Sequence, residues 1–364
     1  MKQGWEIKKL GEVCEIQGGS TPKRTESLYW EGGTYPWFTI EDIREQGRII
    51  TDTKQKVTKV AWDKLRVFPK DTVLLCCTAS IGEYAITHIP ITSNQQFNGL
   101  MIKDKSYLSP MYLMHYCATL KEKLSTLSGK ATIDFVSAEK VRQIPIPIPP
   151  REEQERIVEE LDCLSGVIEK KREQLRELDA LAQSIFYQMF GDPITNEKGW
   201  EVKKFEDCYK LASGNGLSAK YIIDGDYPVY GGNGIVGYHH EYNLDGNNII
   251  IGRVGALCGN VRNIEGKAFI TDNAFILTKK IDNDNVFLLH LLRIHNLRKY
   301  AREAMQPVIS NAGLKNIDII ITPIALQQEF ADKIEAIEKQ KELIKQSITQ
   351  TEELFNARMA YYFN

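Results

Sequence analysis

The sequence predicts an α+β protein in which a strand-rich domain followed by one long helix occurs twice. Segment 4–10 (GWEIKKL) recurs as segment 199–205 (GWEVKKF). Two stretches of about 40 residues carry apolar residues at heptad spacing. The stretches before them hold short β-branched and aromatic runs interrupted by Gly, Asn and Pro. We therefore expect domains at 1–150 and 191–323 and helices at 151–190 and 324–364.

The repeat extends through both domains, although its spacing changes along the chain. Tyr35-Pro36 corresponds to Tyr227-Pro228, and the run 92–94 (TSN) corresponds to 271–273 (TDN). Further on, Pro150 and Gln154 correspond to Pro323 and Gln327. The offset falls from 195 to 173 residues and then stays constant. Insertions therefore lie in the front part of the first unit, which predicts a variable domain joined to a constant helix.

Each predicted helix has a start, an apolar seam and, in the first repeat, a clear stop. Pro150 is typical of a helix start, and Gly191-Asp192-Pro193 is typical of a stop. The seam residues are Ile157, Leu161, Leu164, Ile168, Leu175, Leu178 and Ile185 in the first helix, and Phe330, Ile334, Ile337, Ile344, Ile348 and Phe355 in the second. Forty residues give about 60 Å of helix. Each seam could pack on its own domain, but two seams of equal length favour an antiparallel coiled coil with approximate two-fold symmetry.

The two domains have the composition of short strands and turns. We expect strands within 71–80, 83–89, 247–255 and 267–271, and helices at 110–127 and 285–304. Hence each domain is predicted to be a small α+β fold.

Composition excludes several classes of protein. No apolar run reaches the roughly 18–20 residues that span a bilayer, and the first residues lack the apolar core of a signal peptide. The seven cysteines include no Cys-x-x-Cys pair, so neither a disulfide framework nor a zinc ribbon is expected. These features predict a cytoplasmic protein without membrane contact.

Motifs with catalytic or metal-binding potential are weak. Gly232-x-Gly234-x-x-Gly237 matches a dinucleotide fingerprint, but no helix is predicted after it. His239-His240 has no acid or cysteine spaced to complete a metal site. Asp245, Glu265 and Lys267 resemble a nuclease metal site, which stays open as an alternative. We otherwise predict no catalytic residue, no metal and no bound cofactor.

Three motifs together resemble the DNA-specificity subunit of type I restriction–modification systems. They are the repeated Gly-Trp-x-(Ile/Val)-Lys-Lys opening, the pair 80–82 (SIG) and 93–97 (SNQQF), and the run 144–150 (IPIPIPP) before Glu153-Gln154. The second unit departs from the pattern, because 319–323 (IIITP) replaces the proline-rich run and Gln327-Gln328 stands near the place of Glu153-Gln154. The resemblance covers essentially the whole chain.

The resemblance implies two target-recognition domains, each followed by a conserved helix, with the helices paired antiparallel as a spacer. It implies a bipartite, asymmetric double-stranded DNA site, two methyltransferase subunits and two restriction subunits. S-adenosylmethionine, ATP and Mg are then expected on those partners, and this chain is expected to be non-catalytic. The alternatives are the specificity subunit of a fused restriction–methylation enzyme, the metal nuclease above, and a coiled-coil adaptor that does not bind DNA.

Side chains that can read base edges or phosphates are predicted in both domains. The candidates are Lys23, Arg24, Thr78, Ser80, Gln95 and Gln96 in the first, and Asn215, Asn233, Tyr238, His239, Arg253 and Asn273 in the second. Each has a structural alternative: Gln95 and Asn273 could cap turns, and Arg253 could form an internal ion pair.

The net charge of −2 conceals differences between the segments. Residues 1–150 sum to +4, 151–190 to −4, 191–323 to zero and 324–364 to −2. The helices are therefore expected to contact protein rather than phosphate. We also expect the chain to bind DNA weakly by itself, with the partners supplying much of the phosphate contact.

Overall fold

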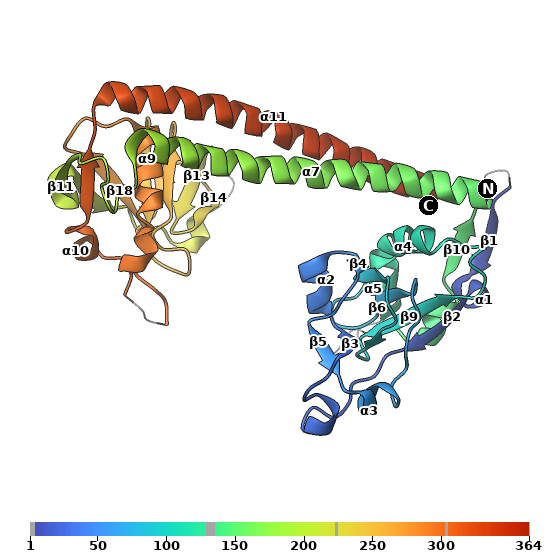
Figure 1. Ribbon diagram of the computed structural model, residues 1–364. Coiled ribbons are helices and arrows are strands. Elements are labelled where there is room, and N and C mark those ends of the chain that lie inside the picture. The colour runs from blue at the N-terminus through green and yellow to red at the C-terminus, as the bar shows by residue number, and fades with distance from the viewer. Residues whose placement is uncertain (1–3, 129–134, 223–224, 303–304, 364) are drawn as a thin grey trace. The chain divides into compact units, whose positions relative to one another are not determined.

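The computed structural model describes residues 4–128, 135–222, 225–302 and 305–363 (Figure 1). The chain forms two compact units: residues 1–170 with 347–364, and residues 171–346. Each unit thus combines one predicted domain with part of both long helices. Residues 1–3, 129–134, 223–224, 303–304 and 364, which the predicted domains include, lie outside the described residues.

The first unit contains a five-stranded sheet, a three-stranded sheet and a two-stranded ribbon. The sheet orders are β2-β9-β6-β7-β4, β5-β3-β8 and β1-β10. The strands are β1 Glu6–Lys9, β2 Cys14–Gly18, β3 Tyr35–Phe38, β4 Ile49–Ile50, β5 Gln55–Val57, β6 Val73–Cys76, β7 Tyr84–Thr87, β8 Thr92–Ser93, β9 Phe97–Ile102 and β10 Pro145–Ile148. The helices are α1 Leu10–Val13, η1 Ser27–Tyr29, α2 Ile40–Gln46, α3 Lys59–Trp62, α4 Pro110–Ala118, α5 Lys121–Ser128 and α6 Ala138–Arg142.

The second unit repeats this topology with fewer elements. Its sheet orders are β12-β18-β15-β16, β14-β13-β17 and β11-β19. The strands are β11 Glu201–Lys204, β12 Tyr209–Ser213, β13 Tyr227–Gly231, β14 Gly234–His239, β15 Asn248–Gly252, β16 Val261–Ile264, β17 Phe269–Ile270, β18 Ala274–Lys279 and β19 Asp318–Ile321. The helices are α8 Phe205–Cys208, η2 Ala219–Tyr221, α9 Asn285–Ile294, η3 Leu297–Tyr300 and α10 Asn311–Leu314. The α+β class and the duplication are confirmed.

The repeated sequence motifs occupy equivalent strands. β1 pairs antiparallel with β10, and β11 pairs antiparallel with β19. The opening motif of each repeat is therefore bonded to the strand just before its long helix. In β10 the isoleucines are buried and the prolines face outward. Because β10 pairs with β1 alone in its sheet, it has no second neighbouring strand that would need the N–H groups that proline lacks.

The long helices are α7 Arg151–Phe190 and α11 Ile324–Phe363, and they pack antiparallel within each unit. In the first unit Arg358 pairs with Glu160 of α7, and Tyr362 lies near Arg156. In the second, Lys341 Nζ lies 2.6 Å from Asp179 Oδ1. The structure buries Ile157, Leu161, Ile168, Phe330, Ile334, Ile337 and Ile348 and half-buries Leu164, Leu175, Leu178, Ile185, Ile344 and Phe355.

One glutamine in each repeat ties the helix start to its domain. Gln154 accepts a hydrogen bond from Ser109 N at 2.8 Å and donates to the carbonyls of Tyr107 and Pro149. Gln327 accepts from Asp284 N at 2.9 Å and donates to the Thr322 carbonyl. Both are fully buried. The predicted correspondence of Gln154 with Gln327 is therefore confirmed, and the second helix start is held in the same way although the sequence around it differs.

Replacing either glutamine by leucine is expected to lower the free energy of unfolding by about 2–4 kcal/mol, because buried backbone groups lose their partners. Chemical denaturation of Gln154→Leu and Gln327→Leu measures this. Gln328→Ala, at the exposed neighbouring position, is the matched control and should change stability by under about 0.5 kcal/mol. Equal stability of all three variants would contradict the assigned role.

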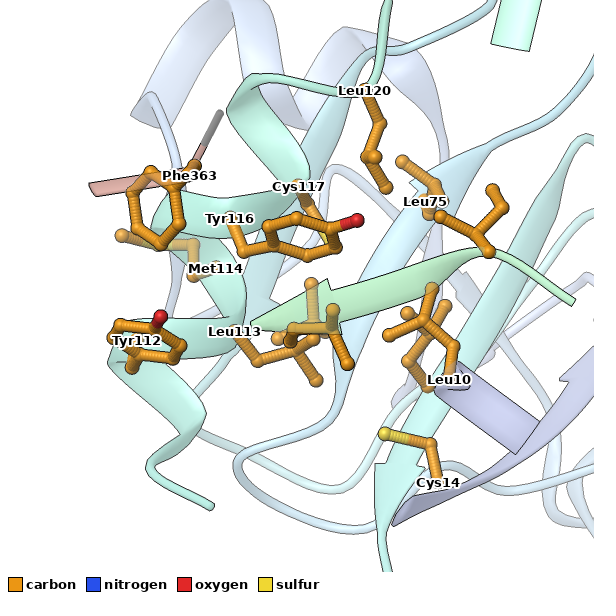
Figure 2. Packing of buried hydrophobic residues seen from close by; sticks show 14 of the residues in the cluster. Leu10, Cys14, Leu75, Tyr112, Leu113, Met114, Tyr116, Cys117, Leu120 and Phe363 are labelled. Atoms are coloured by element: carbon orange, nitrogen blue, oxygen red, sulfur yellow. The ribbon is translucent and has the colours of Figure 1, made fainter. Parts of the chain in front are cut away.

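The end of each long helix packs into the domain of the other repeat. Figure 2 shows Phe363 of α11 beside Tyr112 and Tyr116 of α4. The ring centroids are 5.2 Å apart for Tyr112 and 5.8 Å apart for Tyr116. At the equivalent position Phe190 of α7 lies 4.7 Å from the Phe287 ring on α9. Each domain core is thus completed by a helix that begins in the other repeat.

The predicted helices 110–127 and 285–304 are shorter than expected. The first divides into α4 and α5, with Thr119 and Leu120 between them. The second ends at Ile294, and Asn296 follows in the left-handed region (φ 49°), which interrupts α-helix. Among the described residues no helix is long and apolar enough to cross a membrane.

Two histidines, His295 buried and His290 half-buried, predict that the second unit loses stability in acid. Burial lowers the pKa of both His290 and His295 to about 4, from an ordinary value of 6.5. The unfolded chain therefore binds protons between pH 6.5 and 4 that the folded chain does not, so stability falls as the pH falls through that window. In urea titrations at several pH values, His290→Gln should reduce this dependence. His88→Gln, at an exposed site of the first unit, should leave it unchanged; an unchanged slope for His290→Gln would contradict the prediction.

Candidate nucleic-acid interface

Three loops meet at the same end of the central sheet in each unit. In the first unit they follow β2, follow β6 and precede β9. Ser20 N donates to Ser93 O at 2.8 Å, and Cys77 N donates to Gln96 O at 2.8 Å. In the second unit the equivalent loops follow β12, follow β15 and precede β18. Asn215 N donates to Ile270 O at 3.0 Å, and Arg253 N donates to Asn273 O at 2.8 Å.

Ten of the twelve predicted DNA-contacting residues lie in or beside these loops. Lys23 and Arg24 follow β2, Thr78 and Ser80 follow β6, and Gln95 and Gln96 precede β9. Asn215 follows β12, Arg253 follows β15, Asn273 precedes β18, and Asn233 lies in the turn between β13 and β14. Residues separated by up to about 75 positions in sequence are thereby brought to one sheet end. Their contact with DNA stays a prediction.

Arg24 is held by two tryptophans and a glutamine. Its guanidinium carbon lies 4.0 Å from the Trp30 ring centroid and 4.4 Å from that of Trp37. Its Nη1 donates to Gln55 Oε1 at 2.8 Å. The two indole N–H groups donate to the carbonyls of Lys23 and Ser20, which fixes the loop that carries Arg24. Arg24 is itself exposed.

The other candidates of the first unit differ in how firmly they are held. Asn94 caps the turn before β9 and binds the half-buried Gln96 side chain at 3.0 Å. The exposed Gln95 accepts a hydrogen bond from Thr21 of the loop after β2. Lys23 pairs with Glu26 at 3.1 Å and is 78% exposed. Ser80 lines a cavity of about 430 Å³ that Arg44 and Lys121 also line.

In the second unit the arginine is part of the framework. The Arg253 Nη1 donates to Ser213 Oγ at 3.0 Å and to Asp272 O at 3.3 Å, so it connects the three loops. Its side chain is half-buried and lies over the Phe275 ring. Asn215 and Asn273 are exposed. Arg253 therefore has a structural role, as the alternative proposed, but this role rests on hydrogen bonds and not on an ion pair.

Tyr238 and His239 do not join the loop cluster. They lie at the end of β14 opposite Asn233, where Tyr238 pairs with Pro228 and His239 with Tyr227. The His239 ring packs edge-on against Phe269 at 5.4 Å. The same hairpin contains Gly234 and Gly237, so the dinucleotide fingerprint lies on a strand and not before a helix.

Several residues beside the loops were not predicted. Trp30 and Trp37 support Arg24, Arg66 donates to the Gly18 carbonyl at 2.7 Å, and Arg262 donates to the Asn233 carbonyl at 2.9 Å. No spacing pattern in the sequence connects these residues with the loops, because their approach depends on the sheet topology.

Asp245, Glu265 and Lys267, the residues that resemble a nuclease metal site, each interact with a different neighbour. Lys267 Nζ lies 4.5 Å from the Tyr242 ring, and a hydrogen bond with Tyr242 raises the pKa of this lysine. Glu265 accepts a hydrogen bond from Asn263, and Asp245 accepts one from Gly246 N. Within the described ranges, no group of three or more His, Cys, Asp or Glu residues is placed to hold a metal ion.

Comparison with known proteins gives concordant results. A family model described as the type I restriction modification DNA specificity domain matches residues 2–179 and again 197–353. The EcoprrI specificity subunit of a type I restriction enzyme from Escherichia coli is 32% identical over 338 residues, which cover 87% of this chain and 84% of that protein. The MjaIX specificity subunit of Methanocaldococcus jannaschii is 34% identical over 236 residues, covering 60% of this chain and 54% of that protein.

Solved structures share the fold over the full chain. The S subunit of a type I restriction–modification system from M. genitalium has a TM-score of 0.60 at 15% identity, covering 99% of this chain and 96% of that chain. A chain from a structure on complex assembly and conformational transition of the type I R-M system has a TM-score of 0.63 at 16% identity, covering 100% and 98%. At these identities the likeness concerns the fold alone.

Proposed function

Because the chain belongs to the type I restriction–modification family of DNA specificity subunits, we propose that it reads a bipartite, asymmetric double-stranded DNA site and brings two methyltransferase subunits to it. The observation that carries this proposal is the duplicated loop cluster. Both units offer the same backbone frame, but the loops of the first present Arg24 and Gln95, whereas the loops of the second present Asn215 and Asn273. Two frames with different side chains read two different half-sites.

The long helices supply the surface for protein partners. Residues 151–190 carry a charge of −4 and 324–364 a charge of −2, which disfavours contact with phosphate. Equivalent positions on the two helices can accept two identical methyltransferase subunits, and two restriction subunits complete the assembly. S-adenosylmethionine, ATP and Mg are bound by those partners. The chain itself is non-catalytic and acts in the cytoplasm, where the DNA is.

A DNA-binding titration with and without the methyltransferase subunit of the same genome tests this function. We expect weak binding by the chain alone and tighter, site-selective binding by the complex, with both measured across a salt series. Loss of DNA binding when the partner is present would favour the coiled-coil adaptor. Cleavage of DNA by the purified chain with magnesium alone would favour the nuclease. A neighbouring reading frame that encodes restriction and methyltransferase domains in one chain would identify the partner as a fused restriction–methylation enzyme.

A further inference from the structure

We infer that Arg24 reads a guanine in the first half-site, a specificity assignment that rests on the proposed function. The residue lies in the loop after β2, next to Trp37 of β3 and Gln55 of β5. Its guanidinium is held by Trp30, Trp37 and Gln55, and the residue as a whole is exposed.

The guanidinium of Arg24 has a fixed orientation. An exposed arginine normally samples many rotamers, and ordering it on binding costs free energy. Here two aromatic rings within 4.4 Å and the hydrogen bond to Gln55 select one arrangement before DNA arrives. A fixed planar fork is needed to bind two acceptors on one base edge, whereas a phosphate requires only a nearby positive charge.

Arg24 keeps N–H donors that are free to bind a base. A guanidinium carries five N–H groups, and Gln55 takes one of them at 2.8 Å. Within the described part of the chain, Arg24 forms no ion pair, so its charge is not neutralised by a carboxylate. The N7 and O6 atoms of guanine form the acceptor pair in the major groove that matches an arginine fork.

Lys23 and Arg253 differ from Arg24 in how their charged groups are held. Lys23 is adjacent in sequence and 78% exposed, and its ammonium group pairs with Glu26, so it is suited to phosphate contact. Arg253, in the second unit, is half-buried, and its Nη1 donates hydrogen bonds to Ser213 Oγ and to the Asp272 carbonyl. Of these two loop arginines, Arg24 keeps more of its fork for DNA than Arg253 does, in keeping with an asymmetric site.

The test is methylation of a duplex library with randomised half-site positions, using the full chain assembled with its methyltransferase. The wild-type complex should require a G·C pair at one position of the first half-site. Arg24→Lys keeps the charge but loses the fork, so discrimination at that position should fall roughly 5- to 150-fold. The second half-site should be unchanged. Arg24→Ala should show the same relaxation.

Lys23→Ala is the matched control. It should slow methylation of all sequences by a similar factor and leave the recognised sequence unchanged. Thermal unfolding of each variant distinguishes an altered loop from an unfolded unit. The assignment is overturned if the first half-site contains no G·C pair, if Arg24→Lys retains full discrimination, or if a folded Arg24→Lys complex loses methylation of every sequence alike. A wild-type complex that recognises no bipartite sequence would instead overturn the proposed function.

Discussion

Exchanging residues 1–150 for the first domain of another family member changes one half of the methylated DNA sequence and leaves the other half intact. The loops after β2 and β6 and before β9 all belong to this segment, and they are bonded to one another. The loops of the second unit are held by Arg253, Ser213 and Asp272, which the exchange does not touch. The expected effect is a complete replacement of one half-site, measured by single-base mapping of methylation.

A narrower exchange controls for damage to the fold. The full exchange also removes Tyr112 and Tyr116, which pack against Phe363 of α11. Exchanging only 19–96 keeps α4 and the strands β2 and β9, so the packing of the α11 end is retained. Both chimeras should give the donor's first half-site, with the narrower one the more stable. A change in both half-sites would refute the separate assignment of the two domains.

Inserting one heptad after Leu175 together with one after Ile348 is expected to lengthen the spacer between the half-sites. Seven residues add about 10.5 Å of helix, comparable to three base pairs. The seam repeats every seven residues, so the apolar positions stay in register. Glu160–Arg358 and Asp179–Lys341, the ion pairs that mark the antiparallel arrangement in each unit, both lie outside the insertions.

Insertion into one helix alone is the matched control. A heptad in α7 without one in α11 leaves the two seams unequal in length, so we expect reduced stability and no defined longer spacer. Methylation mapping of the double insertion gives the spacer directly. A double-insertion variant that folds and keeps the original spacer would exclude the helices as the spacing element.

The helices and the duplication could be predicted because they depend on local patterns. The heptad residues from Ile157 to Phe355 repeat with the period of a helix packed along one face, and the structure buries or half-buries all thirteen of these seam positions. The ends Phe190 and Phe363 were not predicted to enter the cores. Their burial depends on which domain each helix reaches, and no local pattern records this.

The candidate interface was predictable in residue type and only partly in position. Gln95 and Asn273 lie at the loop cluster because the same short motif precedes an equivalent strand in both repeats. Tyr238 and His239 look equally suited to DNA in sequence, yet the hairpin places them away from the cluster. The support of Arg24 by Trp30, Trp37 and Gln55 depends on how the loop after β2 folds back against β3 and β5, so it required the structure.

This chain is expected to direct methylation to a two-part DNA sequence, and co-expression with the methyltransferase of the same genome tests this most directly. Single-base mapping of the methylated positions should give two different short half-sites separated by a spacer of constant length. Absence of methylation that depends on this chain, or methylation at one continuous sequence without a spacer, would contradict the account.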